Sequence, residues 1–233
     1  MKYSGSLVKK EREEIFKLFL EHEKLKFNEI EKALKIRSNM VCYHIEKMQK
    51  ERLLEKKGMH YYLTKEAEKF LPIIPHIIGE EMSPLPVVLV AIVKGNQILL
   101  IKRKKRPYKN YWSLIGGKML MEEGLKETSK RLVLEKTGLK CNFESNNAIL
   151  HEKVKGEEII KHSFILFFTK VKAINSELKE SEHGKLKWFS LDKLEKVIHS
   201  DLWLIKNKLH SQIEINEAIM EEDNGKLTTF ELK

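Results

Sequence analysis

The sequence predicts two domains of different class: a mainly helical domain over residues 1–82 and an α+β sandwich with a mixed sheet over residues 83–233. Apolar residues recur at helical spacing in the first part, whereas the second part begins with short apolar runs typical of buried strands. Four of the five prolines cluster between these parts and indicate a boundary, because proline interrupts helices: Pro72, Pro75, Pro84 and Pro86.

The composition indicates a cytoplasmic protein with anionic partners. Charged residues make up 33% of the chain and its net charge is +10, which favours nucleic acid or phosphorylated ligands. We see no signal peptide and no apolar run long enough to span a bilayer, so no membrane contact is expected. Cys42 and Cys141 have no neighbouring His or Cys at metal-ligand spacing. We therefore expect buried, reduced thiols.

Three helices and a hairpin are predicted in the first domain. Helical spacing of apolar residues places two helices at 9–23 and 27–35, and a third begins at Ser38, a plausible N-cap. The hairpin turns near Gly58, and a further helix starts at about Lys65.

This order of elements resembles the winged helix-turn-helix domains of bacterial and archaeal regulators over roughly residues 8–75. The best match is RSNMVCYHIEKMQKERLLEKKGMHYYLT, although Arg52 stands where the family usually has glycine. The resemblance implies a recognition helix in the major groove of double-stranded DNA, with basic residues and the wing on phosphates. The outward and basic candidates for DNA contact are Arg37, Ser38, Asn39, Tyr43, His44, Lys47, Lys56 and Lys57.

Such domains usually act as symmetric dimers. The candidate dimer contact is the apolar segment after the wing, with Phe70, Leu71, Ile73 and Ile74. Residues 37–57 carry six basic and three acidic side chains, a modest excess for a DNA-binding surface. Protein contact or dimerisation therefore remains the alternative role of this domain.

The second domain begins with a predicted hairpin, VVLVAIVK and QILLIKR joined by Gly95 and Asn96. Further strands are predicted near residues 149–152, 163–171 and 186–189. Residues 191–222 are predicted to be mostly helical.

Residues 116–139, GGKMLMEEGLKETSKRLVLEKTGL, carry the strongest motif. They resemble the Nudix box, Gly-x5-Glu-x7-Arg-Glu-U-x-Glu-Glu-x-Gly-U, in which U is a bulky aliphatic residue. Leu132 and Lys136 stand where the family has glutamates. Matches at KNYWSLIGGK and KWFSLDKL extend the resemblance over roughly residues 86–205. The retained positions of the box include Gly117, Glu123, Arg131, Glu135 and Gly138.

In the Nudix family the glutamates that stand at positions 132 and 136 of this chain help to hold divalent metal for diphosphate hydrolysis. Positions 132, 135 and 136 share one helix face, and here only Glu135 is acidic. Glu135 is thus a weak metal-binding and residual catalytic candidate, with Mg2+ or Mn2+ as cofactor if the chain is active and none otherwise. Lys136 either replaces the metal as an anchor for a ligand phosphate or is a solvated helix residue. The resemblance implies that Glu123 and Arg131 form an ion pair and that Gly117 and Gly138 have backbone roles.

Acids outside the box are alternative metal ligands: Glu122, Glu127, Glu157, Glu158, Glu180 or Glu182. A second signal is the stretch 94–118, which has eight basic residues and no acid. Its interleaved aromatic residues could stack on a base, although core packing is favoured for Trp112. The ligand-binding candidates are Lys136, Lys118, Arg103, Arg106, Trp112 and Gly117.

The sequence thus favours a DNA-binding transcriptional regulator whose impaired Nudix-like domain senses a phosphorylated or nucleotide-type metabolite. Regulators of this type respond to ADP-ribose-like compounds or sugar derivatives, usually with the domains in the opposite order. The alternative is an active metal-dependent hydrolase of nucleoside diphosphate derivatives with an accessory winged helix domain. An enzyme that acts on RNA ends also fits the charge but has no specific motif.

Overall fold

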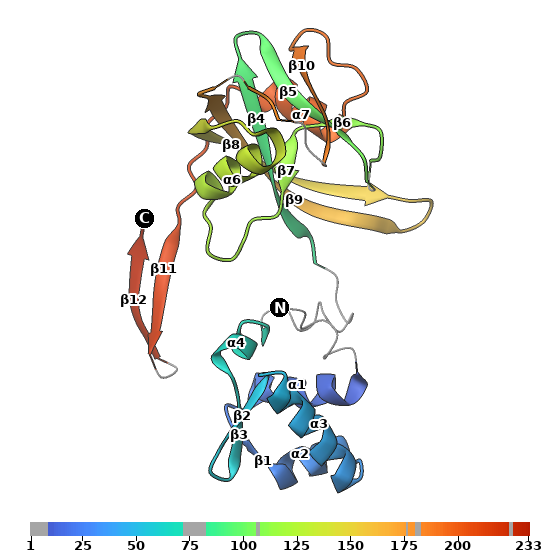
Figure 1. Cartoon of the computed structure of the whole chain (residues 1–233), viewed down its shortest axis with the longest axis vertical. Coiled ribbons are helices and arrows are strands. Elements are labelled where there is room, and N and C mark those ends of the chain that lie inside the picture. Colours follow the sequence, from blue (N-terminus) through green and yellow to red (C-terminus); the bar gives the residue numbers. More distant parts are fainter. Residues whose placement is uncertain (1–8, 72–82, 106–107, 176, 180–182, 224–225) are drawn as a thin grey trace. The chain divides into compact units, whose positions relative to one another are not determined.

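The chain divides into two compact units, Met1–Ser83 and Pro84–Lys233 (Figure 1). None of the helices in the described parts of the chain is long and apolar enough to cross a bilayer. The computed structural model describes residues 9–71, 83–105, 108–175, 177–179, 183–223 and 226–233.

The first unit is built on three helices, as predicted. They are α1 (Lys10–Glu21), α2 (Phe27–Leu34) and α3 (Ser38–Lys50). Their inner faces form one apolar core, in which Phe16 and Ile30 are fully buried. The helical spacing of apolar residues therefore located these helices to within one or two residues.

A three-stranded sheet completes this unit, with the strands in the order β1 (Leu25–Lys26), β3 (His60–Leu63) and β2 (Leu54–Lys57). The hairpin between β2 and β3 turns at Gly58, whose φ is +61°, so this prediction is confirmed. Strand β1 was not predicted, because two residues are too short to show an alternating pattern. The helix after the hairpin, α4, is a single turn (Lys65–Glu68).

Several expectations for the first unit are wrong. Ser38 is the first helical residue and caps nothing: Arg37 holds the N-cap position, and the Ser38 hydroxyl instead donates to Glu31. His44, expected to point outward, is 2% exposed, because the buried face of α3 is wider than the three-residue stripe used to orient it. Cys42 is exposed rather than buried.

The expected dimer contact is described only in part. Phe70 and Leu71 are partly buried against the core of their own unit. Ile73 and Ile74 lie outside the described residues.

The second unit is built on a seven-stranded mixed sheet. Strands β4 and β9 run parallel, and the other neighbours in the sheet are antiparallel. The main strands lie in the order β10 (Gly184–Ser190), β5 (Gln97–Arg103), β4 (Leu85–Lys94), β9 (Ile160–Ala173) and β8 (Cys141–Lys155), with short β6 (Trp112–Ser113) on β5 and β7 (Ile115–Gly117) on β4.

Helices cover both faces of this sheet. Successive side chains of a strand point to opposite faces, and β4 shows this clearly. Val88 joins the core beneath helix α6 (Leu125–Thr137), whereas Leu89 joins the core beneath helix α7 (His199–Lys208). The predicted α+β sandwich with a mixed sheet is therefore confirmed for this unit.

The prediction that residues 191–222 are mostly helical is wrong. After α7 the chain continues without helix to a separate hairpin, β11 (Ala218–Asp223) and β12 (Lys226–Leu232). The overlooked signal is the Asn-Gly pair at positions 224 and 225, a dipeptide that favours tight hairpin turns.

Candidate functional site

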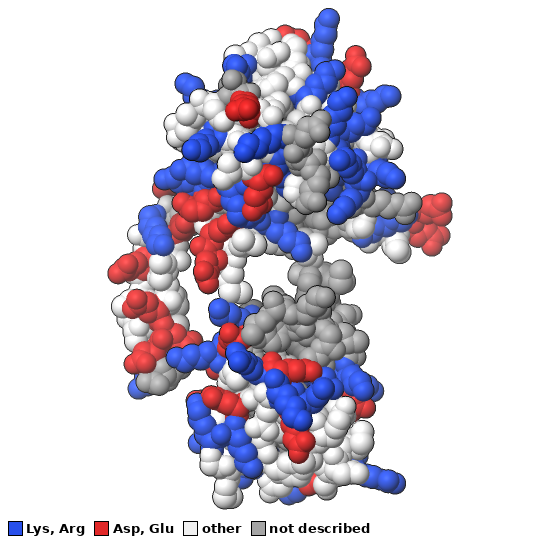
Figure 2. Space-filling view, in the orientation of Figure 1, with Lys and Arg blue, Asp and Glu red and all other residues white. Residues whose placement is uncertain are grey.

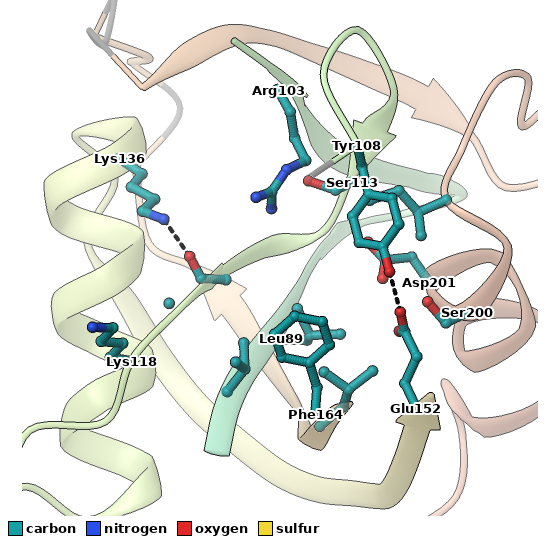
Figure 3. Close-up of a pocket in the computed structure, with 15 residues that line it drawn as sticks. Leu89, Arg103, Tyr108, Ser113, Lys118, Lys136, Glu152, Phe164, Ser200 and Asp201 are labelled. Carbon is teal, nitrogen blue, oxygen red and sulfur yellow. Dashed lines mark hydrogen bonds between the residues drawn. The ribbon is translucent and has the colours of Figure 1, made fainter. Parts of the chain in front are cut away.

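A cavity of about 290 Å³ opens at one end of the sheet in the second unit (Figure 3). Its floor is apolar and includes Leu89, Phe164 and Leu166. Cationic side chains from α6 and the loop before it lie on one side, and a tyrosine with two carboxyl groups lies on the other (Figure 3). The cavity therefore has an apolar base between two walls of different polarity.

The cationic wall is formed by Lys118 and Lys136. Arg103 of β5 lies between this wall and Tyr108, with its guanidinium carbon 5.9 Å from the centroid of the Tyr108 ring (Figure 3). The Lys136 ammonium is partly buried and donates a hydrogen bond to the Gly116 carbonyl oxygen. Burial, followed by repulsion from Arg103, lowers the pKa of Lys136. These three predicted ligand-binding residues thus come together, whereas Arg106 lies outside the described residues.

Leu132 occupies the box position where the resemblance implies a metal-binding glutamate. It is 3% exposed and belongs to the core between α6 and the sheet. A Cβ atom added to Gly117 would lie 2.5 Å from the Leu132 Cδ2 atom. The missing side chain of Gly117 thus makes room for an apolar residue here.

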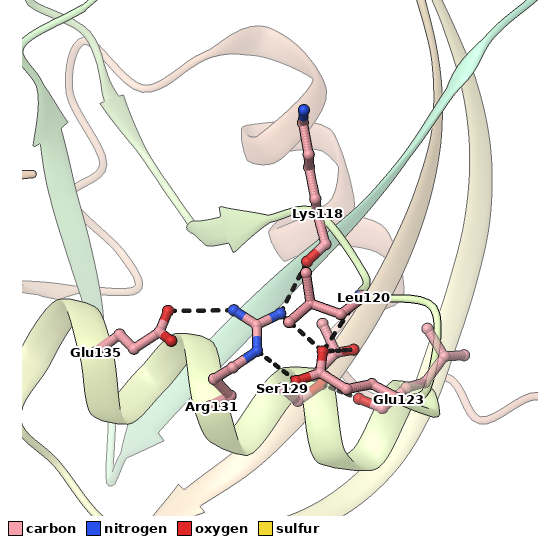
Figure 4. Close-up of polar contacts among 8 residues, drawn as sticks. Lys118, Leu120, Glu123, Ser129, Arg131 and Glu135 are labelled. Atoms are coloured by element: carbon pink, nitrogen blue, oxygen red, sulfur yellow. Dashed lines mark hydrogen bonds and ion pairs between the residues drawn. The ribbon is translucent and has the colours of Figure 1, made fainter. Parts of the chain in front are cut away.

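Arg131 ties the box together (Figure 4). Its Nε lies 2.5 Å from Glu123 Oε1, and its Nη2 donates to the Lys118 carbonyl oxygen at 2.9 Å. The ion pair that the resemblance implies is therefore present. The hydrogen bonds from Arg131 lower the pKa of Glu123 to about 2. Gly138 ends α6 with a φ of +73°, the backbone role expected for it.

Glu135 is less available to a metal than its position suggests. Its side chain is 50% exposed, and its Oε2 atom is 3.1 Å from Arg131 Nη1. Beside it on the same helix face stand an apolar Leu132 and a cationic Lys136, neither of which offers an oxygen. This donor set does not fit a divalent metal.

The acidic residues outside the box that the structure describes do not supply the missing metal ligands at this cavity. Within the described parts of the chain, no group of three or more His, Cys, Asp or Glu side chains is arranged to hold a metal ion. Glu180 and Glu182 lie outside the described residues. The cavity-lining residues do not include Glu122, Glu127, Glu157 or Glu158.

The opposite wall was not predicted from the sequence. Asp201 is 3% exposed and accepts a hydrogen bond from the Leu114 backbone amide at 2.8 Å. Its burial raises the pKa of this carboxyl group to about 7. The Tyr108 hydroxyl donates to Glu152, and burial, followed by this bond, raises the pKa of Tyr108.

No local motif marks these three residues. They come from a loop, from β8 and from α7, and only the tertiary fold brings them together. Their chemistry suits the polar edge of a ligand, since carboxyl and hydroxyl oxygens accept hydrogen bonds. Trp112, by contrast, packs against Phe189 with ring centroids 4.8 Å apart, and it is not among the cavity-lining residues.

In the first unit, the candidate DNA contacts fall into two groups. Arg37, Asn39, Tyr43 and Lys47 are exposed on or just before α3, and Lys56 and Lys57 are exposed on β2. Lys57 is paired with Glu55 at 2.6 Å. Lys and Arg side chains are mixed with acidic ones on the visible surface of this unit (Figure 2), consistent with the modest local charge excess.

His44 does not belong with these surface residues. It is buried, and neither of its ring nitrogens has a hydrogen-bond partner. Desolvation lowers the pKa of His44. The ring therefore packs as a neutral core residue and is withdrawn from the set of exposed DNA contacts.

Comparisons with known proteins bear on the second unit. The NUDIX domain family model matches residues 83–209. The chain is 32% identical over 118 residues to the ADPR responsive transcriptional repressor NtrR of Acinetobacter baylyi, covering 47% of this chain and 46% of that protein. It is 31% identical over 129 residues to the ADP-ribose pyrophosphatase of Methanocaldococcus jannaschii, covering 54% of this chain and 73% of that protein.

The chain thus spans about half the length of the repressor that it matches. Among solved structures it is similar to a MutT NUDIX hydrolase from Burkholderia pseudomallei, with 25% identity, a TM-score of 0.49 and coverage of 54% of this chain and 98% of the other. It is also similar to the NUDIX domain of Shewanella oneidensis NrtR complexed with ADP ribose, with 18% identity, a TM-score of 0.45 and coverage of 55% and 88%.

Proposed function

The chain belongs to the NUDIX domain family, and on that premise we propose that it is a DNA-binding transcriptional regulator whose NUDIX domain senses a nucleotide-type ligand. In this proposal the second unit binds a nucleoside diphosphate derivative and hydrolyses it poorly. The first unit is a winged helix domain that binds double-stranded DNA, and ligand binding changes its affinity for DNA.

The observation that carries the proposal is the replacement of metal-binding acids by Leu132 and Lys136. NUDIX hydrolases generally use divalent metals, but here Leu132 is core and the Lys136 ammonium faces the cavity. A cation fixed beside Arg103 attracts phosphate directly, as ammonium and guanidinium groups do in other phosphate sites. It does not activate water, so binding without efficient cleavage is the expected result.

The shape of the cavity supports a ligand with two different ends. Phosphates suit the cationic wall, a base or sugar suits the apolar floor, and hydrogen-bond donors of the ligand suit Glu152 and Asp201. The names of two relatives both refer to ADP-ribose, one as the effector of a repressor and one as the substrate of a pyrophosphatase. We propose ADP-ribose or a closely similar compound as the ligand.

The DNA-binding part of the proposal rests on the arrangement of the first unit. Exposed Asn39, Tyr43 and Lys47 lie on α3, the helix that would enter the major groove. Asparagine can pair with adenine, and lysine can reach guanine or phosphate. Because winged helix regulators usually bind paired half-sites, the active form is proposed to be a homodimer.

Calorimetric titration of ADP-ribose in buffer with EDTA tests the ligand site. We expect Lys136→Glu to weaken binding at least tenfold, because it exchanges attraction of phosphate for repulsion. Lys130→Glu, on an exposed position of the same helix, is the matched control and should bind like the wild type. Equal affinity in the Lys136 variant would remove this residue from the site. If ADP-ribose does not change the DNA affinity of the wild type in a mobility-shift assay, the regulatory part of the proposal is wrong.

A working hydrolase is the second candidate, because Glu135 is retained and the pyrophosphatase relative is matched over 73% of its length. The test is turnover of nucleoside diphosphate derivatives with Mg2+ or Mn2+, comparing the wild type with Leu132→Glu/Lys136→Glu. Activity only in the double variant would support a sensor that has lost its metal site. Robust turnover by the wild type would place the hydrolase first.

A further inference from the structure

The C-terminal hairpin is unlike the other elements of the second unit. Strands β11 and β12 form a sheet of their own, and every described residue in them is exposed. A two-stranded hairpin is marginally stable by itself in water and is stabilised by packing against another element. We therefore expect this hairpin to pack against another element.

One face of the hairpin is apolar. Cross-strand partners lie on the same face, and these pairs are Met220 with Phe230 and Ala218 with Leu232. Phe230 is 62% exposed and Leu232 is 66% exposed. An apolar sheet face of this kind is normally packed on a core, and contiguous exposed apolar surface marks an interaction site.

The other face is mostly polar. Glu221 lies opposite Thr229, whose hydroxyl donates to the Glu221 carboxylate at 2.9 Å. Ile219, opposite Glu231, is the one large apolar side chain among the paired residues of this face. The hairpin is thus amphipathic, and only one of its faces suits burial.

A second exposed apolar segment lies next to the root of the hairpin. Residues 119–121, in the loop between β7 and α6, are Met, Leu and Met, with Met121 76% exposed. This loop leads into Leu125 at the start of α6, whose backbone amide donates to Glu217 Oε1 at 3.1 Å. Glu217 immediately precedes β11, so the root of the hairpin and the base of the loop are joined.

We propose that the apolar face of the hairpin packs onto loop 119–121 and the adjoining body of a second copy of the chain, whose own hairpin packs onto the first copy in the same way. The inference rests on the proposed function in one respect, since a regulator of paired half-sites needs two copies. It adds a contact to the earlier candidate, of which Phe70 and Leu71 are partly buried against the core of their own unit.

Charge favours a second copy of this chain as the occupant. Residues 217–233 hold five acidic and two basic side chains, whereas the whole chain has a net charge of +10. Acidic side chains of the hairpin stand out beside uncharged ones in Figure 2. Such an arm is repelled by nucleic acid and by anionic membranes, and it is attracted to the basic remainder of a second copy.

Area explains why the loop must take part. Strands of six and seven residues, at about 3.4 Å per residue and about 4.8 Å between strands, present roughly 200 Å² on one face. A stable dimer buries about 800 Å² per partner. Exchange of hairpins onto the loop and body of the other copy adds the missing area, and a two-fold arrangement repeats each contact.

Sedimentation of the full chain at micromolar concentration tests the proposal. We expect a dimer for the wild type and at least a tenfold weaker dimer for Met220→Glu/Phe230→Glu. Ile219→Glu introduces one such negative charge on the polar face and should leave the dimer intact. A monomeric wild type, or equal dissociation constants for wild type and double variant, would overturn the proposal.

Two further measurements separate this proposal from neighbouring ones. If the double variant keeps its mass but melts at lower temperature, the face packs within one chain and the proposal is wrong. Titration of ADP-ribose reports the proposed function independently. A monomeric double variant that still binds ADP-ribose supports both proposals, and dimerisation without ligand or DNA binding by the wild type refutes only the proposed function.

Discussion

The ammonium of Lys136 donates a hydrogen bond to the carbonyl oxygen of Gly116, so a lysine of α6 is bonded to the strand that borders the cavity. This bond holds a positive charge beside the cavity. It also orients the side chain, because the carbonyl oxygen accepts from one N–H and leaves the others directed elsewhere. The cation is therefore already in place beside the cavity, as the proposed binding of a phosphorylated ligand requires.

Gly117→Ala should destabilise the second unit. The added methyl group would lie 2.5 Å from Leu132 Cδ2, and overpacking of this kind costs about 1–3 kcal/mol. Leu132→Ala alone should also destabilise by leaving a cavity. In Gly117→Ala/Leu132→Ala the new methyl group fills part of that cavity, so the total loss should be smaller than the sum of the single losses. Urea unfolding of the four proteins measures this, and strict additivity would show that the two residues do not compete for space.

Asp201 should make ligand binding depend on pH near neutrality. Its pKa is raised to about 7 by burial, so the group is mainly neutral below this pH and anionic above it. Negative charge in the cavity opposes a phosphorylated ligand, and affinity should therefore fall as pH rises from 6 to 8. Asp201→Asn keeps the shape and cannot ionise. Calorimetry with ADP-ribose should show a flat profile for this variant, whereas parallel profiles would assign the dependence to another group.

The same carboxyl group links pH to stability. Because its pKa is higher in the folded than in the unfolded chain, it favours folding at low pH and loses that contribution as pH rises through about 7. The melting temperature of the wild type should therefore fall between pH 6 and 8 relative to that of Asp201→Asn.

His44 should make the first unit sensitive to acid. Its ring is buried without hydrogen-bond partners, and burial lowers its pKa. Glu11 on α1 partly opposes this effect, while Arg12 and Lys9 reinforce it. A lowered histidine pKa means that stability is present above the unfolded value of about 6.5 and is lost as pH falls below it. The free energy of unfolding of His44→Leu should not show this dependence between pH 7 and 5. An unchanged pH profile in the variant would show that another group causes the dependence.

Arg52→Gly should stabilise the first unit. Arg52 has a φ of +58°, in the left-handed region that glycine adopts without a steric cost. We expect a gain of about 0.5–1 kcal/mol, less than the full strain because glycine also gains freedom in the unfolded chain. Arg52→Ala removes the same side chain but keeps the Cβ atom, and chemical denaturation should show no gain for it. A loss of stability in the glycine variant would mean that the arginine side chain has a packing role.

The sequence was sufficient where apolar residues repeat with a clear period. Helix α3 begins at the predicted residue, and β4 and β5 flank Gly95 as expected. It was insufficient where length or context decides. Strand β1 has two residues, and the orientation of His44 depends on how closely α1 packs on α3, which periodicity does not report.

The candidate site divides in the same way. Lys118 and Lys136 could be placed in advance because a motif of fixed spacing carries them. Glu152 and Asp201 could not, since β8 and α7 meet at the cavity only through the order of strands in the sheet. A carboxylate becomes recognisable as part of a site once its burial is known, and burial is a property of the fold.

Glu217 bonds the last segment of the chain to the first residue of α6, where the loop that bears Lys118 ends. Its carboxylate receives the backbone amide of Leu125, and its carbonyl oxygen receives the amide of Lys233. Packing of the hairpin against a second copy therefore also restrains the start of α6. In return, a ligand that orders the loop before α6 favours the packed hairpin. Such coupling is reciprocal by thermodynamic necessity, so the ligand affinity of this chain should vary with its own concentration.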